Sequence, residues 1–164
     1  MSLNTAYFGV VANGMAVCAA KITVVHMLTV RERLMSGQFV QSVDSTLLSP
    51  IATVFKTLMG CFGPSLGGEP FIARCERIAK NVAENETIFF LLAMSYGLMN
   101  PPQDGKTQTA TQLVQIYTGA RVAHTLVYLT NFELPTKLGL RGVSYIVGTL
   151  CGVSLVGLVA TAKK

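Results

Sequence analysis

The 164-residue chain contains no tryptophan and few charged side chains, and these shortages are the first guide to its class. Charged residues make up 13% of the sequence, whereas they make up roughly a quarter of an average soluble domain. Apolar residues make up 51%, and the mean hydropathy is +0.49. This composition excludes an ordinary soluble domain and indicates a protein whose helices lie in a membrane.

Several kinds of site and architecture are disfavoured by what the sequence lacks. The four cysteines and two histidines form no C-x-x-C pair and no ligand cluster, so we expect neither a disulfide framework nor a metal site. The chain also has no internal repeat, which weakens the hypothesis of a small channel or transporter built from inverted repeats. Ion flux in liposomes would test that hypothesis.

Four stretches are long and apolar enough to cross a bilayer as helices, which takes about 20 residues. We predict an all-α integral membrane protein with a single four-helix domain over residues 1–164. The helices are expected at about 7–30, 74–99, 108–130 and 140–162, with a cytosolic loop at 31–73. The first helix has no basic segment before it, since Lys21 is the first charge, so we expect it to be retained and not cleaved as a signal peptide.

The basic residues are distributed unevenly between the predicted loops. Eight of the 13 lysines and arginines fall between the first two helices, on the entry to the second, or between the last two up to the start of the fourth, whereas Lys106, Lys163 and Lys164 fall on the other side. Since cytosolic loops hold the excess of Lys and Arg, we expect both termini to be luminal and the two basic loops to be cytosolic. The net charge of +5 follows from this asymmetry and does not indicate nucleic-acid binding.

Polar side chains recur at helical spacing inside three of the predicted helices. Charged groups at membrane depth are unfavourable, so they usually face the inside of a bundle and mark function. The stripes consist of Arg77, Lys80, Asn81 and Glu84; of Arg121, His124 and Tyr128; and of Arg141 and Tyr145. Each residue taken singly has a structural explanation, such as an ion pair or an interfacial aromatic. Together with Arg31 they form a cation-rich set that suits a small polyanion bearing an amine.

Two segments of the sequence resemble the motifs of a known family. The segments "RCERIAKNVAEN" (74–85) and "GARVAHTLVYLT" (119–130) resemble the second-helix and third-helix signatures of the membrane-associated proteins in eicosanoid and glutathione metabolism. This family includes microsomal glutathione transferase and microsomal prostaglandin E synthase. The resemblance implies a homotrimer of four-helix subunits in an intracellular membrane such as the endoplasmic reticulum. It also implies that glutathione binds between subunits near the cytosolic face.

The resemblance further implies which residues contact glutathione. They are Arg31, Arg77, Lys80, Asn81, Glu84, Arg121, His124, Tyr128, Arg141 and Tyr145, of which Arg77 and Arg121 match basic positions that brace helices as much as they touch ligand. The cations would meet the two carboxylates of glutathione, and Glu84 would meet its amino group. Arg141 matches the position beside the sulfur, where a cation lowers a thiol pKa below its free value of about 8.5. Tyr128 or Tyr145 would donate a further hydrogen bond, so these three residues are the expected catalytic residues.

Three positions depart from the family pattern. Lys80 stands where relatives usually have arginine or leucine, and lysine cannot form the bidentate fork of arginine. Gly142 stands where the prostaglandin synthase has a serine proposed to assist the thiol, and Asp44 only lies near the place of an acidic residue implicated in that enzyme. Gly142, together with the fit of "GARVAHTLVYLT" to the broad transferases, favours a general transferase and peroxidase over the alternative activity, the isomerisation of a prostaglandin endoperoxide.

We therefore expect an enzyme that activates glutathione as thiolate and delivers it to a lipophilic electrophile or lipid hydroperoxide arriving from the bilayer. Its partners would be further copies of itself, membrane lipids and the lipophilic substrate. A function of another class is that of a non-catalytic lipid-binding adaptor with the same fold. Such an adaptor has no evident need of Arg31, Glu84, Tyr128 and Arg141, and glutathione binding would separate the two hypotheses.

Overall fold

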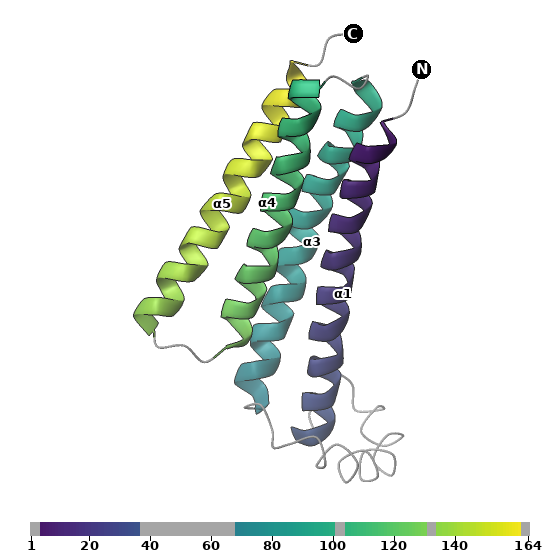
Figure 1. Ribbon diagram of the computed structural model, residues 1–164. Helices are drawn as coiled ribbons and strands as arrows, with labels where there is room; N and C mark the ends of the chain where they lie inside the picture. The colour runs from purple at the N-terminus through teal and green to yellow at the C-terminus, as the bar shows by residue number, and fades with distance from the viewer. Residues whose placement is uncertain (1–3, 37–67, 101–103, 131–133, 162–164) are drawn as a thin grey trace. The chain divides into compact units, whose positions relative to one another are not determined.

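The computed structural model describes residues 4–36, 68–100, 104–130 and 134–161, and these segments are helical almost throughout (Figure 1). The helices are α1 (Thr5–Ser36), α3 (Gly68–Met99), α4 (Asp104–Leu129) and α5 (Leu134–Ala160). No strand occurs in the described segments, so the predicted all-α architecture with four helices is confirmed. Asp44, Lys163 and Lys164 lie outside the described residues.

The helices extend beyond the apolar stretches that predicted them. The first continues to Ser36, the second begins at Gly68 and the last begins at Leu134. Hydropathy marks the part of a helix that suits hydrocarbon, whereas the helix itself continues as far as its backbone hydrogen bonds allow. Pro70 falls in the first turn of α3, where a helix has no use for the missing N–H group.

Two of the helices, α1 and residues 139–160 of α5, are long and apolar enough to cross a membrane by length and composition alone. The helices α3 and α4 carry more charged and amide side chains, which explains why their hydropathy is too low for them to be counted with α1 and α5. One face of α5 is apolar and exposed, since Val143, Ile146, Leu150 and Val153 are each more than half exposed. An apolar face of this kind suits contact with lipid or with another subunit.

Side-chain amides stabilise the ends of two helices. The Asn4 side chain precedes α1, and its Oδ1 accepts a hydrogen bond from the Tyr7 backbone N–H at 3.1 Å, which makes Asn4 an N-cap. At the other end of α3, the Asn100 side chain donates to the Tyr96 carbonyl at 3.0 Å. Pro101 follows Asn100 in the sequence. A proline disfavours the helical conformation of the residue before it, so α3 ends there.

The chain divides into two compact units. Unit 1 comprises Met1–Ile22 and Asn81–Lys164, and unit 2 comprises Thr23–Lys80. Unit 1 therefore contains the beginning of α1, the later part of α3, and all of α4 and α5. Its apolar core consists of Tyr7, Val11, Cys18, Phe89, Phe90, Ala93, Tyr96, Ala110, Val114, Tyr117, Cys151 and Leu155.

Contacts at small residues fix how the helices of unit 1 pack. A Cβ atom on Gly14 would lie 2.8 Å from Oγ1 of Thr118 and 3.1 Å from the Phe90 ring, so α1 approaches α3 and α4 closely there. The Tyr7 hydroxyl donates to the Ala93 carbonyl at 2.9 Å and ties α1 to α3. These contacts place the first half of α1 against the second half of α3.

Helix α5 packs on α4 along a stripe of buried residues. Ser144, Gly148, Cys151 and Leu155 are buried and recur at helical spacing. At Gly148 an added Cβ would lie 3.7 Å from Cδ of Arg121, so the arginine stem on α4 passes directly beside the α5 backbone. This approach brings the polar stripes of α4 and α5 together.

Unit 2 has its own apolar contacts and ion pairs. Val25 on α1 and Phe71, Ile72, Cys75 and Ile78 on α3 are buried. Arg33 pairs with Glu76 at 2.5 Å, and Arg74 stacks over the Phe71 ring at 5.5 Å. The described cysteines Cys18, Cys75 and Cys151 are free and buried, and Cys61 lies outside the described residues.

Candidate functional site

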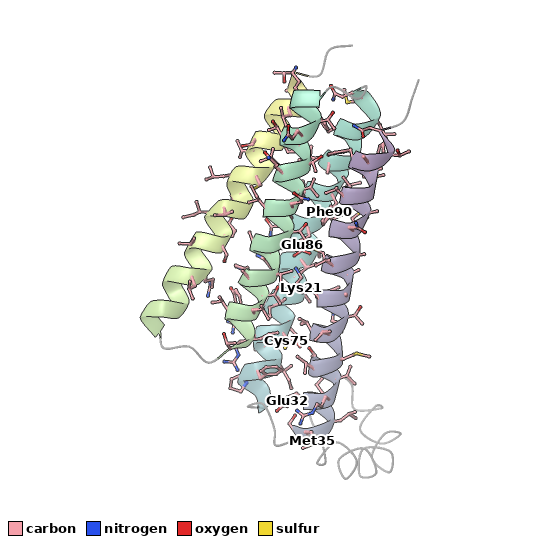
Figure 2. All side chains as sticks on the ribbon, in the orientation of Figure 1. Lys21, Glu32, Met35, Cys75, Glu86 and Phe90 are labelled. Carbon is pink, nitrogen blue, oxygen red and sulfur yellow. The ribbon has the colours of Figure 1, made fainter. Side chains whose placement is uncertain are left out.

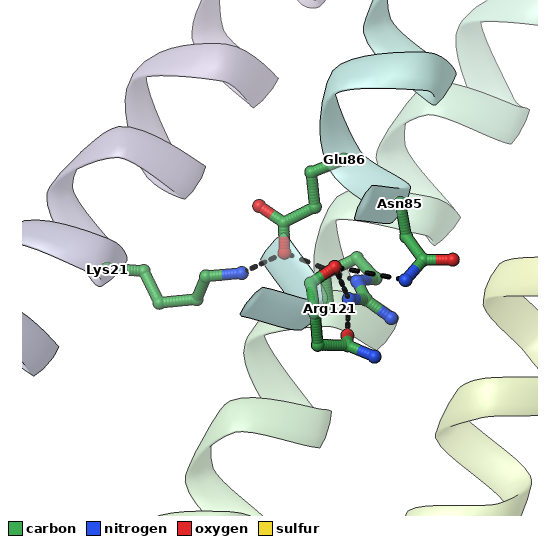
Figure 3. Close-up of polar contacts among 5 residues, drawn as sticks. Lys21, Asn85, Glu86 and Arg121 are labelled. Atoms are coloured by element: carbon green, nitrogen blue, oxygen red, sulfur yellow. Dashed lines mark hydrogen bonds and ion pairs between the residues drawn. The ribbon is translucent and has the colours of Figure 1, made fainter. Parts of the chain in front are cut away.

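A buried ionic network joins three helices of unit 1 (Figure 3). Glu86 on α3 accepts hydrogen bonds at Oε1 from Lys21 on α1 and from Nε of Arg121 on α4, the latter at 3.2 Å. The second terminal nitrogen of Arg121 donates to the side-chain oxygen of Asn81 and lies 3.4 Å from its carbonyl oxygen. Asn85 donates to that same carbonyl at 3.0 Å, which completes the network.

The network is shielded from solvent. The side chains of Lys21, Glu86 and Arg121 are 8%, 4% and 4% exposed. Removing one partner from a buried ion pair leaves an uncompensated charge and is strongly destabilising. The network therefore has a structural role in holding α1, α3 and α4 together, and Arg121 acts in it as a bracing residue.

The pairing of Lys21 with Glu86 was not predicted from the sequence. Both lie near the middle of their helices in Figure 2, and neither belongs to a polar stripe on its own helix. The signal that would have found them is a pair of opposite charges within two apolar stretches, since isolated charges at membrane depth usually pair with one another. The Lys21 side chain is thus engaged in a buried ion pair with Glu86.

A cleft of about 290 Å³ opens between α3, α4 and α5. Its polar lining residues include Glu84, Arg121 and Tyr145, one from each helix, and all three belong to the predicted site. The remaining lining residues are Asn85, Ile88, Phe89, Leu92, Tyr117, Gly148, Thr149, Gly152, Val153 and Val156. The structure thus brings three of the predicted residues to one cleft that is otherwise mostly apolar.

Three further predicted residues contact one another at the ends of α4 and α5. The guanidinium of Arg141 lies 4.6 Å from the centre of the Tyr128 ring, in a cation–π arrangement. The Tyr128 ring in turn lies 5.0 Å from the ring of His124, one turn earlier on α4. His124 is buried, Tyr128 is half-buried and Arg141 is exposed, so this row of side chains leads from the bundle interior to its surface.

Arg141 has the properties of a cation available to a ligand. Its positive charge is held against the Tyr128 ring, and no described carboxylate lies within ion-pair distance of it. Tyr145, one turn further along α5, is 48% exposed and lines the cleft. The two side chains therefore lie on the same side of α5, one at the cleft and one a turn away from it.

The remaining predicted contacts, Arg31, Arg77 and Lys80, belong to unit 2. Arg77 and Lys80 are exposed, and Arg31 is half-buried with Nη1 lying 3.5 Å from Oε2 of Glu32. Glu32 is completely buried and was not singled out from the sequence. Its carboxylate is a local counter-charge for Arg31 within the same unit.

The chemistry of these groups fits glutathione. Within unit 1 the candidate site offers an exposed guanidinium, two phenol hydroxyls and the Glu84 carboxylate beside a cleft with apolar walls. Cations can bind the carboxylates and the thiolate of the tripeptide, a carboxylate can bind its amino group, and the apolar walls suit a lipophilic partner. The residues present thus match the donors and acceptors that such a ligand requires.

Comparison with known proteins gives the family. No curated protein and no solved structure matches the chain. The profile of the MAPEG family, however, matches residues 11–161, from α1 to the end of α5. This match covers nearly all of the sequence and confirms the resemblance carried by the two helix motifs. The chain therefore belongs to the MAPEG family, the family of microsomal glutathione transferase and prostaglandin E synthase.

Proposed function

We propose that this protein is a membrane-bound glutathione transferase and peroxidase. In this function glutathione is bound as thiolate and reacts with lipophilic electrophiles or lipid hydroperoxides. Membership of the MAPEG family, whose members use glutathione, supports the co-substrate. The observation that carries the proposal is the exposed Arg141 guanidinium, held over the Tyr128 ring at 4.6 Å and without a described carboxylate partner.

Each residue of the site has a distinct task in this function. Arg141 stabilises the negative charge of the thiolate, because a nearby cation favours the charged form of a thiol. The Tyr128 ring orients Arg141, and the Tyr145 hydroxyl donates a hydrogen bond to the sulfur or to the developing charge. Glu84 binds the amino group of the tripeptide. The contacts of its carboxylates with Arg31, Arg77 and Lys80, which belong to unit 2, stay a prediction from the family resemblance.

Glutathione supplies the thiolate nucleophile. In conjugation, the sulfur forms a bond to an electrophilic carbon while a leaving group departs with its electron pair, or while a conjugated carbonyl takes up the charge and then a proton. In peroxide reduction, two glutathione molecules are oxidised to one disulfide, and the hydroperoxide is reduced to an alcohol and water. The protein orients the reactants and stabilises the anion in both reactions.

The proposal includes an assembly and a location. We infer a homotrimer in an intracellular membrane such as the endoplasmic reticulum, with both termini luminal and glutathione entering from the cytosol. The exposed apolar face of α5 supports this, because it suits lipid or a neighbouring subunit. The lipophilic substrate would reach the site laterally from the bilayer.

The first test is an ultraviolet titration of the purified, detergent-solubilised protein with glutathione at neutral pH. A saturable thiolate absorbance is expected for the natural protein. Arg141→Ala should remove this absorbance and lower turnover on the order of a hundredfold, while some glutathione affinity remains. Arg141→Lys should keep part of the signal, because it retains the charge but loses the planar guanidinium.

A matched control is Lys106→Ala, which removes one exposed positive charge from the start of α4. It should leave the thiolate signal unchanged. Unchanged turnover in Arg141→Ala would remove the catalytic assignment of Arg141. An intact oligomer that binds fatty acid but not glutathione would instead indicate a lipid-binding adaptor. Turnover of a prostaglandin endoperoxide is the alternative activity, and Gly142 disfavours it because glycine has no hydroxyl to assist the thiol.

A further inference from the structure

The hydroxyl of Tyr117 is buried without a hydrogen-bond partner among the described residues. The side chain is only 3% exposed and lines the cleft between α3, α4 and α5. Leaving a buried hydrogen-bond donor unpaired is unfavourable, and such groups in natural proteins usually have a ligand, a water or a functional role. The Tyr117 hydroxyl therefore requires an explanation beyond packing.

The position of Tyr117 within the cleft follows from the helix register. Tyr117 precedes Arg121 by one turn on α4, and its ring stacks on Phe89 with centroids 3.5 Å apart and planes 3° from parallel. The cleft lining changes from polar to apolar along the direction from Arg121 to Tyr117. On α3 it passes from Glu84 to Leu92, and on α5 it passes from Tyr145 to Val156. Tyr117 thus lies one turn beyond the polar residues, where the cleft lining becomes apolar.

The other hydroxyl in the apolar part of the cleft is already engaged. Thr149 also lines the cleft, but its hydroxyl donates to the Tyr145 carbonyl within α5 at 3.0 Å. Its hydrogen atom is therefore used inside the helix. Within the apolar part of this lining, Tyr117 is therefore the hydroxyl whose hydrogen-bonding capacity is unused by the described residues.

We propose that Tyr117 is a substrate-binding residue that donates a hydrogen bond to an oxygen atom of the lipophilic substrate in this cleft. This inference rests on the proposed function. The apolar walls formed by Leu92, Val153 and Val156 hold the hydrocarbon part, and the Tyr117 hydroxyl between them selects substrates that carry a carbonyl or peroxide oxygen near the reacting atom. The stack on Phe89 fixes the ring, so the hydroxyl is held in place before substrate binds.

A pair of substrates with the same carbon skeleton isolates this hydrogen bond. The thiolate adds to the conjugated carbon of cinnamaldehyde, the carbonyl oxygen takes up the negative charge, and the product then gains a proton on carbon. With cinnamyl chloride, the carbon–sulfur bond forms while the carbon–chlorine bond breaks and chloride leaves. Only the aldehyde has an oxygen atom that can accept a hydrogen bond from Tyr117.

The test is the Tyr117→Phe variant of the full-length protein, assayed with both substrates and glutathione. Phenylalanine keeps the stack on Phe89 and removes only the hydroxyl. The kcat/KM for cinnamaldehyde should fall about three- to tenfold, the size expected for one hydrogen bond, while that for cinnamyl chloride stays the same. The thiolate absorbance should be unchanged and the thermal midpoint should not fall, since the buried hydroxyl has no partner among the described residues to lose.

A control variant and two contrary outcomes make the test decisive. Tyr96→Phe removes another buried tyrosine hydroxyl, beside Tyr7 and not in this cleft lining, and should leave the ratio of the two substrates unchanged. If the ratio of kcat/KM for cinnamaldehyde to that for cinnamyl chloride is unchanged in Tyr117→Phe, whether both values persist or both fall equally, the binding role is refuted and the transferase function stays intact. If the natural protein turned over neither substrate with glutathione, the proposed function and the inference built on it would both fail.

Discussion

Arg121 on α4 donates from Nε to Oε1 of Glu86 on α3 at 3.2 Å, and both side chains are only 4% exposed. The same oxygen accepts a hydrogen bond from Lys21, so one carboxylate compensates two buried cations. Arg121 also lines the cleft that contains Glu84 and Tyr145. The ionic network that braces the bundle therefore borders the proposed site directly.

Glu86→Gln is expected to destabilise the protein strongly. The substitution keeps the size of the side chain but leaves Lys21 and Arg121 without a counter-charge, and breaking a buried ion pair in this way costs about 3–5 kcal/mol. Thermal unfolding in detergent would show a lower midpoint. Adding Lys21→Met to Glu86→Gln should recover part of the loss, because the double variant removes one of the two uncompensated cations.

Glu76→Gln is the matched control for this prediction. It makes the same chemical change on the same helix, in the ion pair with Arg33, where the Glu76 side chain is 54% exposed. An exposed ion pair contributes about 0–1 kcal/mol, so this variant should unfold close to the natural protein. Equal effects of the two substitutions would contradict the role assigned to the buried network.

Gly14→Ala should also lower stability, because the added methyl group would lie 2.8 Å from Thr118 Oγ1 and 3.1 Å from the Phe90 ring. Relieving this contact requires the Thr118 side chain, the Phe90 ring or α1 to move, and overpacking of this kind typically costs about 1–3 kcal/mol. At Gly9 an added Cβ meets no atom within 4 Å, so Gly9→Ala should be neutral or stabilising by up to about 1 kcal/mol through helix propensity. Thermal midpoints of the two variants should therefore move in opposite directions or differ clearly. Equal midpoints would show that α1 is not closely packed at Gly14.

Hydropathy and helical spacing predicted much of this architecture, because both are local properties of the chain. The four helices were predicted in the right order, and the residues His124, Tyr128 and Arg141 that were assigned to one site do contact one another. The family membership followed from two short motifs and is confirmed by the profile match. These features depend on residues that are close in sequence or fixed by a motif.

Hydropathy and helical spacing could not predict the partner of Lys21 or the unused hydrogen-bonding capacity of the Tyr117 hydroxyl. Spacing along one helix shows which residues share a face, but it does not show which residue of another helix lies opposite. The Lys21–Glu86 pair joins residues 65 positions apart, and it depends on the rotation and depth of two helices. Unused hydrogen-bonding capacity, as in Tyr117, is visible only when the surroundings of the group are known.

Tyr128 is expected to act through its ring, which holds the Arg141 guanidinium in position. The ring lies 4.6 Å below the Arg141 guanidinium, and a cation–π contact of this kind contributes about 0.5–2 kcal/mol. Tyr128→Leu removes the aromatic face, so Arg141 loses its fixed position and kcat/KM for glutathione-dependent turnover should fall about two- to twentyfold. Tyr128→Phe keeps the face and should retain most of the turnover. A loss in Tyr128→Phe as large as in Tyr128→Leu would assign the effect to the hydroxyl, and equal activity of Tyr128→Leu and the natural protein would remove Tyr128 from the site. The thiolate absorbance of each variant distinguishes the steps, because a displaced Arg141 lowers that signal whereas a lost contact to the second substrate does not.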